Sequence, residues 1–175
     1  MKLNGIEVKD DPIKNAERLN DIAELGLDNP EVDAELQQLA TEAAQALGLP
    51  IGVVSIVLDE AQWFVAMHGV DGWVAEAGGT PVEWSFCRNV VRNEAEFVVE
   101  NAIEHDIMQD SPLVQMEGLR CYAGIPLVSS KGYCIGSFCV KGTEPKEFTE
   151  AELSKLRRFA DKAIERIESR RKVSV

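Results

Sequence analysis

The stretch Arg120–Val140, RCYAGIPLVSSKGYCIGSFCV, decides which fold this chain can adopt. It holds two apolar runs, Cys121–Val128 and Tyr133–Val140, separated by the polar residues Ser129–Gly132. Apolar runs of this length between turn residues are typical of strands that are buried on both faces. The polar break is too short for a parallel crossover, so the sequence predicts an antiparallel hairpin with a positive φ at Gly132.

Three residues inside this hairpin carry further expectations. Pro126 lacks a backbone donor, so it should lie where the strand ladder is open or bulged. Cys134 and Cys139 are separated by an odd number of positions. On a regular strand they would point to opposite faces, and they could not form a disulfide with each other.

Capping residues and apolar periodicity predict the elements around the hairpin. In chain order they are a helix from Pro12 to Gly26, a helix from Pro30 to Gly48, strands over Leu49–Leu58 and Gln62–His68, a loop over Gly69–Thr80, a short strand from Pro81 that leads into a helix beginning near Ser85, a strand over Glu96–Val99, a long irregular segment over Asn101–Met116 with a short helix after Pro112, and a helix from Thr149.

The last helix has the clearest signals. Thr149 is followed three positions later by Glu152, the pattern of a capping box. Apolar residues then recur at spacings of three and four: Leu153, Leu156, Ala160, Ala163 and Ile167. Phe159 and Ile164 widen this stripe beyond what one contact needs, so we expect a homodimer through the terminal helices. The alternative is that the stripe packs on the first helix of the same chain.

Composition bounds what the chain can be. Its 175 residues suit a single domain, with an amino-terminal helix and turn over 1–28, a sheet and pocket over 29–148, and a final helix over 149–175. No apolar run approaches the roughly 20 residues of a spanning helix, and the first residues do not resemble a signal peptide. We therefore expect no membrane partner and a cytoplasmic protein.

Charge and cysteine usage exclude two kinds of partner. The net charge of −12 would repel a nucleic acid over most of the surface. The four cysteines are not spaced as zinc ligands, and the chain has only two histidines to assist them. The sequence therefore predicts no metal site and no nucleic-acid partner.

Short segments between Arg18 and Phe159 follow one another in a characteristic order: Arg18-Leu19, Gln62-Trp63-Phe64, Ser85-Phe86-Cys87, Asp110–Val114, Arg120–Leu127, Ile135–Val140 and Phe148-Thr149. Together they resemble the GAF domain family, the small sensory module of bacterial signalling proteins, in the subgroup with SFC and YAGIPL-like motifs. The resemblance implies an α+β fold: a central antiparallel sheet of about six strands, with the terminal helices on one face and a ligand-type pocket under lid segments on the other.

The resemblance also implies where a ligand would lie. It places pocket walls at Trp63, Trp84, Phe86 and Tyr122, whose rings suit a flat ligand but could equally fill the core. Asp110 and Arg120 are expected to face each other across the pocket mouth. There they would either orient a polar ligand or form a structural ion pair that holds the lid.

Cys87 is the redox candidate among the pocket residues. It follows the predicted cap at Ser85 and precedes Arg88, and both a helix start and a cation favour the thiolate. The alternative is a small packed thiol.

Three functional classes follow. We expect a stand-alone sensory or regulatory module that binds a small molecule or senses redox state and signals through its terminal helices to a partner protein. A redox enzyme related to free methionine sulfoxide reductase is disfavoured, because the lid segment Glu100–Arg120 lacks the cysteine that such enzymes use. The third class is a pure interaction module with an occluded pocket. A tetrapyrrole attachment cysteine is absent, since Tyr122 and not histidine follows Cys121. The sequence identifies no ligand or cofactor, and we expect no enzymatic activity.

Overall fold

The computed structural model describes residues 2–3, 6–7, 11–27 and 32–171. Its centre is a six-stranded sheet in the order β5-β4-β3-β8-β7-β6, in which every neighbouring pair is antiparallel. The strands are β3 (Ile51–Val57), β4 (Ala61–His68), β5 (Gly79–Pro81), β6 (Phe97–Val99), β7 (Cys121–Val128) and β8 (Cys134–Gly142). The expected hairpin is thus confirmed as β7–β8, and the sheet places it next to the earlier hairpin β3–β4.

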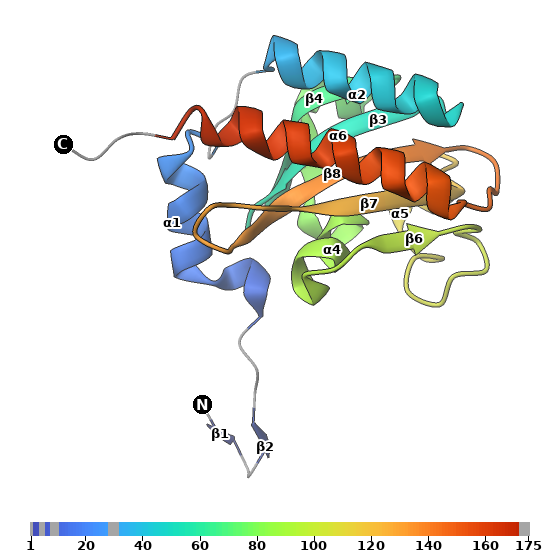
Figure 1. Ribbon diagram of the computed structural model, residues 1–175. Coiled ribbons are helices and arrows are strands. Elements are labelled where there is room, and N and C mark those ends of the chain that lie inside the picture. Colours follow the sequence, from blue (N-terminus) through green and yellow to red (C-terminus); the bar gives the residue numbers. More distant parts are fainter. Residues whose placement is uncertain (1, 4–5, 8–10, 28–31, 172–175) are drawn as a thin grey trace.

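Helices cover both faces of this sheet. They are η1 (Pro12–Lys14), α1 (Ala16–Glu24), α2 (Ala34–Leu47), α3 (Gly72–Ala77), η2 (Val82–Trp84), α4 (Cys87–Asn93), α5 (Pro112–Gln115) and α6 (Glu150–Glu168), and the short strands β1 (Lys2–Leu3) and β2 (Ile6–Glu7) pair with each other. Helices α2 and α6 lie across one face, which we call the helix face, while α4 lies on the other (Figure 1). The α+β architecture is as the sequence predicts. Among the described residues, no helix is long and apolar enough to cross a membrane.

The two sheet faces bury separate cores. Side chains of the helix face, such as Ile56, Phe138 and Val140, join residues of α1, α2 and α6. Alternate side chains such as Val53 and Tyr122 point to the opposite face and pack against α4 and the lid segment. Because both faces are covered, β8 is buried along its whole length, which explains why its sequence is an apolar run without polar alternation.

The amino-terminal elements differ from the prediction in their boundaries. The first helix is interrupted at Asn15, whose side chain accepts a hydrogen bond from the Arg18 amide and starts α1 after the short η1. Asn29-Pro30 lies outside the described residues. Helix α2 is capped instead by Asp33, whose carboxylate accepts from the amides of Glu35 and Leu36. A helix that begins after Asp33 has its first free amides satisfied by the Asp33 carboxylate, which explains why α2 begins there.

The segment Gly69–Thr80 was expected to be loop, and this was wrong. It contains α3, which Gly78 ends in the left-handed conformation with φ of 69°, followed by strand β5. The glycines here lie at the ends of the helix rather than inside it, so the apolar residues between them are free to form a turn of helix. The strand expected from Pro81 correspondingly ends at Pro81.

The expectation that Cys134 and Cys139 point to opposite faces was also wrong. The β7–β8 register shifts between Leu127 and Val128, so that Leu127 lies opposite Gly136 while Val128 lies opposite Cys134. The irregularity breaks the alternation at Ile135, and both cysteines lie in the core opposite the helix face. Both are free thiols. Pro126 lies next to this irregularity. It follows Gly124, the last residue of β7 that pairs with β6, so one side of β7 has no neighbouring strand at Pro126, as predicted.

Helix α6 begins with the predicted capping box between Thr149 and Glu152. Its seam residues Leu156, Ala160, Ala163 and Ile167 are buried within the same chain. Phe159 stacks on Phe138 of the sheet, with ring centroids 6.1 Å apart. Much of the apolar stripe is therefore used inside the chain, against the sheet and α2.

Arg18 fastens α1 to the sheet. It is 2% exposed, and its guanidinium donates to the carbonyls of Val57 at 2.7 Å, Ile13 at 2.8 Å, Pro12 at 3.0 Å and Cys134 at 3.3 Å. These acceptors lie in three separate parts of the chain, and a planar fork of donors can reach all of them at once. The first family motif thus has a structural role.

We predict that Arg18→Lys destabilises the protein by about 3 kcal/mol or more, because one ammonium cannot replace several charge-assisted hydrogen bonds. Urea unfolding followed by circular dichroism measures this loss. Arg92→Lys is the matched control: Arg92 has a side chain 44% exposed and pairs with Asp11, so it should cost less than about 1 kcal/mol. Equal unfolding midpoints for the two variants would contradict the fastening role.

Candidate ligand-binding site

A cavity of about 250 Å³ opens beside β3, β4 and β8 on the side of the sheet away from α2 and α6. Its lining is mostly apolar and comes from segments far apart in the sequence: Pro50, Ile51, Phe64, Gly69, Val70, Asp71, Val74, Thr80, Leu113, Glu117, Leu119, Lys141 and Thr143. Helix α3 and the lid segment around α5 contribute to its walls. The cavity is smaller than the roughly 300–1,000 Å³ of drug-sized sites, so it suits a small molecule.

Lys141 is the buried charge in this cavity. It lies near the end of β8, opposite Tyr122 on β7 and Ile51 on β3. The residue is only 5% exposed. Its ammonium lies 5.5 Å from the ring centroid of Phe64 and 5.9 Å from that of Tyr122, within the range of cation–π attraction. Within the described part of the chain no carboxylate lies within 4.0 Å of the ammonium.

Gln62 holds a buried hydrogen-bond network beside the cavity. Its amide oxygen accepts from the hydroxyls of Ser55 at 2.9 Å and Ser85 at 2.7 Å, and its amide nitrogen donates to the Thr80 hydroxyl at 2.6 Å. Ser85 in turn accepts from the amide of Arg88. Ser85 therefore serves the first turn of α4 as predicted, although the helix boundary lies at Phe86.

A cluster of two thiols lies next to Lys141 on the same face of β8, in the core opposite the helix face. The sulfur of Cys87, at the start of α4, is 3.9 Å from that of Cys139 on β8. The Tyr122 hydroxyl donates to Cys87 at 3.1 Å and lies 3.0 Å from the Ser137 hydroxyl, which can donate to it. A Cβ on Gly124 would overlap the Tyr122 hydroxyl, so glycine at this position gives the tyrosine its space. The arrangement is a buried dithiol held by two hydroxyl groups.

The two sulfurs of this cluster differ in acidity. Burial raises the pKa of Cys87, but the thiol of Cys139, the charge of Lys141 and the hydroxyls of Tyr122 and Ser137 outweigh it, so the pKa lies below the ordinary thiol value. Burial and the neighbouring Cys87 raise the pKa of Cys139 well above that value. Cys87 is therefore the more acidic thiol of the pair, and the Tyr122 hydroxyl is placed to donate to its sulfur.

The structure brings three of the predicted site residues together. Phe86 stacks on Tyr122 with ring centroids 5.1 Å apart, and Tyr122 contacts Cys87. All three are buried, and they lie in the core next to the cavity rather than among its lining residues. The expectation that Phe86 and Tyr122 form pocket walls is replaced by the alternative, packing in the core.

The other four predicted residues lie apart from the cavity. Phe64, and not its neighbour Trp63, lines it. Trp84 packs edge-on against Trp73, with centroids 5.4 Å apart. Asp110 is exposed, while Arg120 donates to the carbonyls of Val114 and Leu119, both at 2.9 Å.

No ion pair joins Asp110 and Arg120 in the described structure. Arg120 fixes the lid segment through backbone carbonyls, because Val114 and Leu119 bring these acceptors within its reach. Of the two alternatives for these residues, the structural ion pair is therefore not formed, while a role in orienting a polar ligand stays a prediction.

Sequence reasoning missed Phe64, Cys139 and Lys141. A usable signal existed for the last two: Ser137, Cys139 and Lys141 alternate along one strand, so they share one face. That this face holds both the thiol of Cys87 and a cavity depends on α3, α4 and the lid, which the strand pattern does not show.

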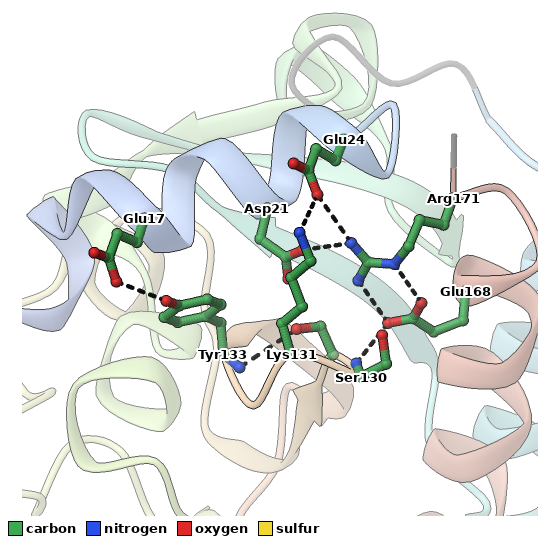
Figure 2. A network of polar contacts seen from close by, with 9 residues as sticks. Glu17, Asp21, Glu24, Ser130, Lys131, Tyr133, Glu168 and Arg171 are labelled. Atoms are coloured by element: carbon green, nitrogen blue, oxygen red, sulfur yellow. Dashed lines mark hydrogen bonds and ion pairs between the residues drawn. The ribbon is translucent and has the colours of Figure 1, made fainter. Parts of the chain in front are cut away.

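A second polar network lies at the turn of the β7–β8 hairpin (Figure 2). Arg171, after the end of α6, pairs with Asp21 at 2.6 Å and Glu24 at 3.2 Å on α1, and with Glu168 on α6 at 2.8 Å. The backbone amide of Ser130 in the turn donates to Glu168 at 2.6 Å. The hydrogen bond from Arg171, with that amide, lowers the pKa of Glu168 to about 2.

The same turn also contacts α1 directly. Lys131 pairs with Glu24 at 2.5 Å, and the Tyr133 hydroxyl donates to Glu17 at 2.8 Å. The turn, α1 and the end of α6 are thus tied to one another, at the opposite end of β8 from Lys141 (Figure 2).

We predict that the ultraviolet absorbance of thiolate titrates well below the ordinary thiol pKa of about 8.5 in the native protein, and that Cys87→Ser removes this step. Cys134→Ser is the control and should leave it in place, because burial raises the pKa of Cys134 to about 11. A wild-type titration no lower than that of a model thiol would contradict the assignment.

The sign of the linked stability follows from the lowered pKa. The thiolate of Cys87 stabilises the folded state above the unfolded thiol pKa, and this contribution is lost as the pH falls through the folded value. The stability difference between wild type and Cys87→Ser should therefore shrink on acidification.

Comparison with known proteins agrees with this architecture. The chain is 32% identical over 152 residues to a cyclic di-GMP phosphodiesterase of Pseudomonas aeruginosa; the match covers 86% of the chain but spans only 25% of that relative.

Two solved structures show the same fold. One is the GAF domain of an Acinetobacter phosphoenolpyruvate-protein phosphotransferase (TM-score 0.59, 16% identity, 89% of this chain and 93% of that one). The other is the type II free methionine-R-sulfoxide reductase of Thermoplasma acidophilum (TM-score 0.62, 10% identity, 81% and 95%). At these identities the likenesses show the fold alone. The family model of the GAF domain matches residues 31–167, and the chain belongs to the GAF domain family.

Proposed function

We propose that this chain is a sensory GAF module that binds a small molecule in the cavity and signals through its terminal helices to a partner protein. The observation that carries the proposal is the position of β8, which touches both regions. Lys141 near one end of the strand lines the cavity, while the turn before its other end is tied to α1 and α6. A ligand that moves β8 would therefore change the contacts of both terminal helices.

The similarity to a cyclic di-GMP phosphodiesterase supports a role in signalling. Because the chain spans a quarter of that relative, the catalytic activity in its name is not transferred to this chain. We propose a regulatory role without enzymatic activity, in the cytoplasm, where the four free and buried cysteines would stay reduced.

A homodimer through the terminal helices belongs to the same proposal. The apolar seam of α6 packs inside the chain, so it leaves less apolar surface for a dimer interface than the sequence indicates. What remains is a groove lined by Ala46, Lys155, Arg158, Phe159 and Lys162, to which α2 and α6 both contribute. A second copy could place its own α6 there in a symmetric pair.

We predict that native mass spectrometry of freshly purified protein shows a dimer with a bound small molecule. Val74→Phe fills the cavity and should lose the added mass. Val32→Phe is the matched control at a position 55% exposed and should keep it. A wild-type protein without added mass would favour the interaction module with an occluded pocket, and a monomer at micromolar concentration would contradict the dimer.

The buried dithiol favours redox sensing as a second candidate function. A peroxide would react with the Cys87 thiolate, forming an S–O bond and releasing hydroxide as the O–O bond breaks. The Cys139 thiol would then attack the sulfenic sulfur; its proton leaves with the sulfenic hydroxyl as water, and a disulfide forms. The 3.9 Å between the sulfurs requires only a small movement for this second step.

We predict that hydrogen peroxide lowers the mass of the wild-type chain by that of two hydrogen atoms, and that a reductant reverses the change. Peptide mapping should join Cys87 to Cys139. The variant Cys139→Ser should lose the bond, whereas Cys121→Ser should keep it, since Cys121 lies outside the cluster. Unchanged mass at peroxide levels that oxidise a model thiol would leave these two residues with a packing role only.

A further inference from the structure

We propose that the cavity recognises a small organic monoanion, whose carboxylate pairs with Lys141 while its apolar body rests on the cavity walls. This inference rests on the proposed function, because it names the chemical class of the ligand for the same cavity. It goes beyond that function by predicting which small molecules are excluded.

The first support is an unpaired buried cation. Lys141 is 5% exposed, and within the described residues no hydrogen bond or ion pair joins its ammonium to a protein acceptor. The nitrogen is not among the fully buried polar atoms that lack a partner, so the ammonium keeps its access to the cavity. A buried ammonium normally requires charge-assisted partners. The rings of Phe64 and Tyr122 attract it but cannot accept its three N–H groups. A carboxylate in the cavity would supply the missing acceptors.

The second support is the chemistry of the walls. Ile51, Phe64, Val74, Leu113 and Leu119 offer apolar surface, and Thr143 adds a polar side chain. A volume of about 250 Å³ accommodates a compact body with few atoms. Bare inorganic anions would leave this apolar surface without a partner.

The acidic residues of the cavity limit the charge of the ligand. Asp71 and Glu117 also line the cavity and are exposed. The Glu117 carboxylate accepts from the indole of Trp73 at 2.8 Å. Together with the net charge of −12, these carboxylates would repel a ligand with several negative charges. A single carboxylate placed at Lys141 fits this distribution best.

The competing interpretation is that the Cys87 thiolate alone balances Lys141. The two charges attract each other through space. However, the Lys141 ammonium forms no hydrogen bond with the sulfur of Cys87 or of Cys139. Its N–H groups can therefore donate to a ligand in the cavity. The two interpretations differ in what happens when the charge of Lys141 is removed.

Benzoate and its neutral isostere benzamide are the probes, with inorganic phosphate as the bare anion. Binding is measured by calorimetry and by the shift of the melting temperature of the full chain. In the wild type, benzoate should bind and raise the melting temperature, whereas benzamide and phosphate should have little effect. Lys141→Met should weaken benzoate binding at least about tenfold. The melting temperature of the ligand-free protein should fall only slightly, by the part of the Cys87 thiolate's stabilisation that Lys141 supplies.

Two variants serve as controls. Lys14→Met removes an exposed lysine and should leave benzoate binding unchanged. Val74→Phe should block benzoate by filling the cavity, which shows that binding takes place there.

The outcomes separate this inference from the proposed function. Equal binding of benzamide, equal binding of phosphate, or full benzoate binding by Lys141→Met would overturn the organic-anion inference while a cavity ligand remains possible. A ligand-free Lys141→Met that melts well below wild type would assign Lys141 a structural role as the partner of Cys87, and would overturn it too. If purified protein carries a bound molecule but no probe binds, the proposed function stands and this inference fails. If neither is seen, both fail.

Discussion

The structure depends on the hydrogen-bonded pairing of β8 with β3 on one side and β7 on the other. This places the last strand of the sheet at its centre, where both faces must be covered. Gly136 permits the close approach, since a Cβ there would overlap the carbonyl oxygen of Ser55 on β3. Once β8 is fixed, α2 and α6 cover one face, and α4 and the lid cover the other.

Burial on both faces gives polar groups on β8 a strict requirement for partners. Ser137 meets it through the Tyr122 hydroxyl, and Cys139 through the sulfur of Cys87. Lys141 meets it least well, with two aromatic rings but no acceptor in the described structure. Because the ammonium faces the cavity without a protein acceptor among the described residues, its N–H groups remain free to donate to a ligand.

At the opposite end of β8, around the turn, charged side chains of the described residues form ion pairs. Arg171 joins α1 to α6, and Lys131 joins the turn to α1 (Figure 2). The Lys131–Glu24 pair is exposed and individually weak, whereas Asp21 in the pair with Arg171 is buried. Together the pairs link three segments that are far apart in the sequence. Because β8 joins the cavity at one end to these ion pairs at the other, it provides a physical route by which the cavity could influence the terminal helices.

The sequence by itself determined what depends on neighbours along the chain. The tight break at Ser129–Gly132 required an antiparallel hairpin, and Thr149 with Glu152 required a helix start. The order of the short motifs identified the family, and the family resemblance predicted the six-stranded sheet. Local signals failed where a longer-range contact decided the outcome. Asn15 caps α1 and so interrupts the first helix, and the Arg18 that follows it bonds to the sheet. The irregularity at Ile135 places Cys134 on the same side as Cys139.

Only the tertiary structure decided the candidate site. Of the seven residues expected at the pocket, none lines the cavity, because a cavity is a space left between elements and no single element encodes it. The contact between Cys87 and Cys139 joins residues 52 positions apart, and Lys141 shares the lining of the cavity with Val74 of α3 and Leu113 of the lid segment. Alternation along β8 could predict which side chains share a face, but what covers that face depends on the packing of segments distant in the chain, and burial and charge pairing are set there.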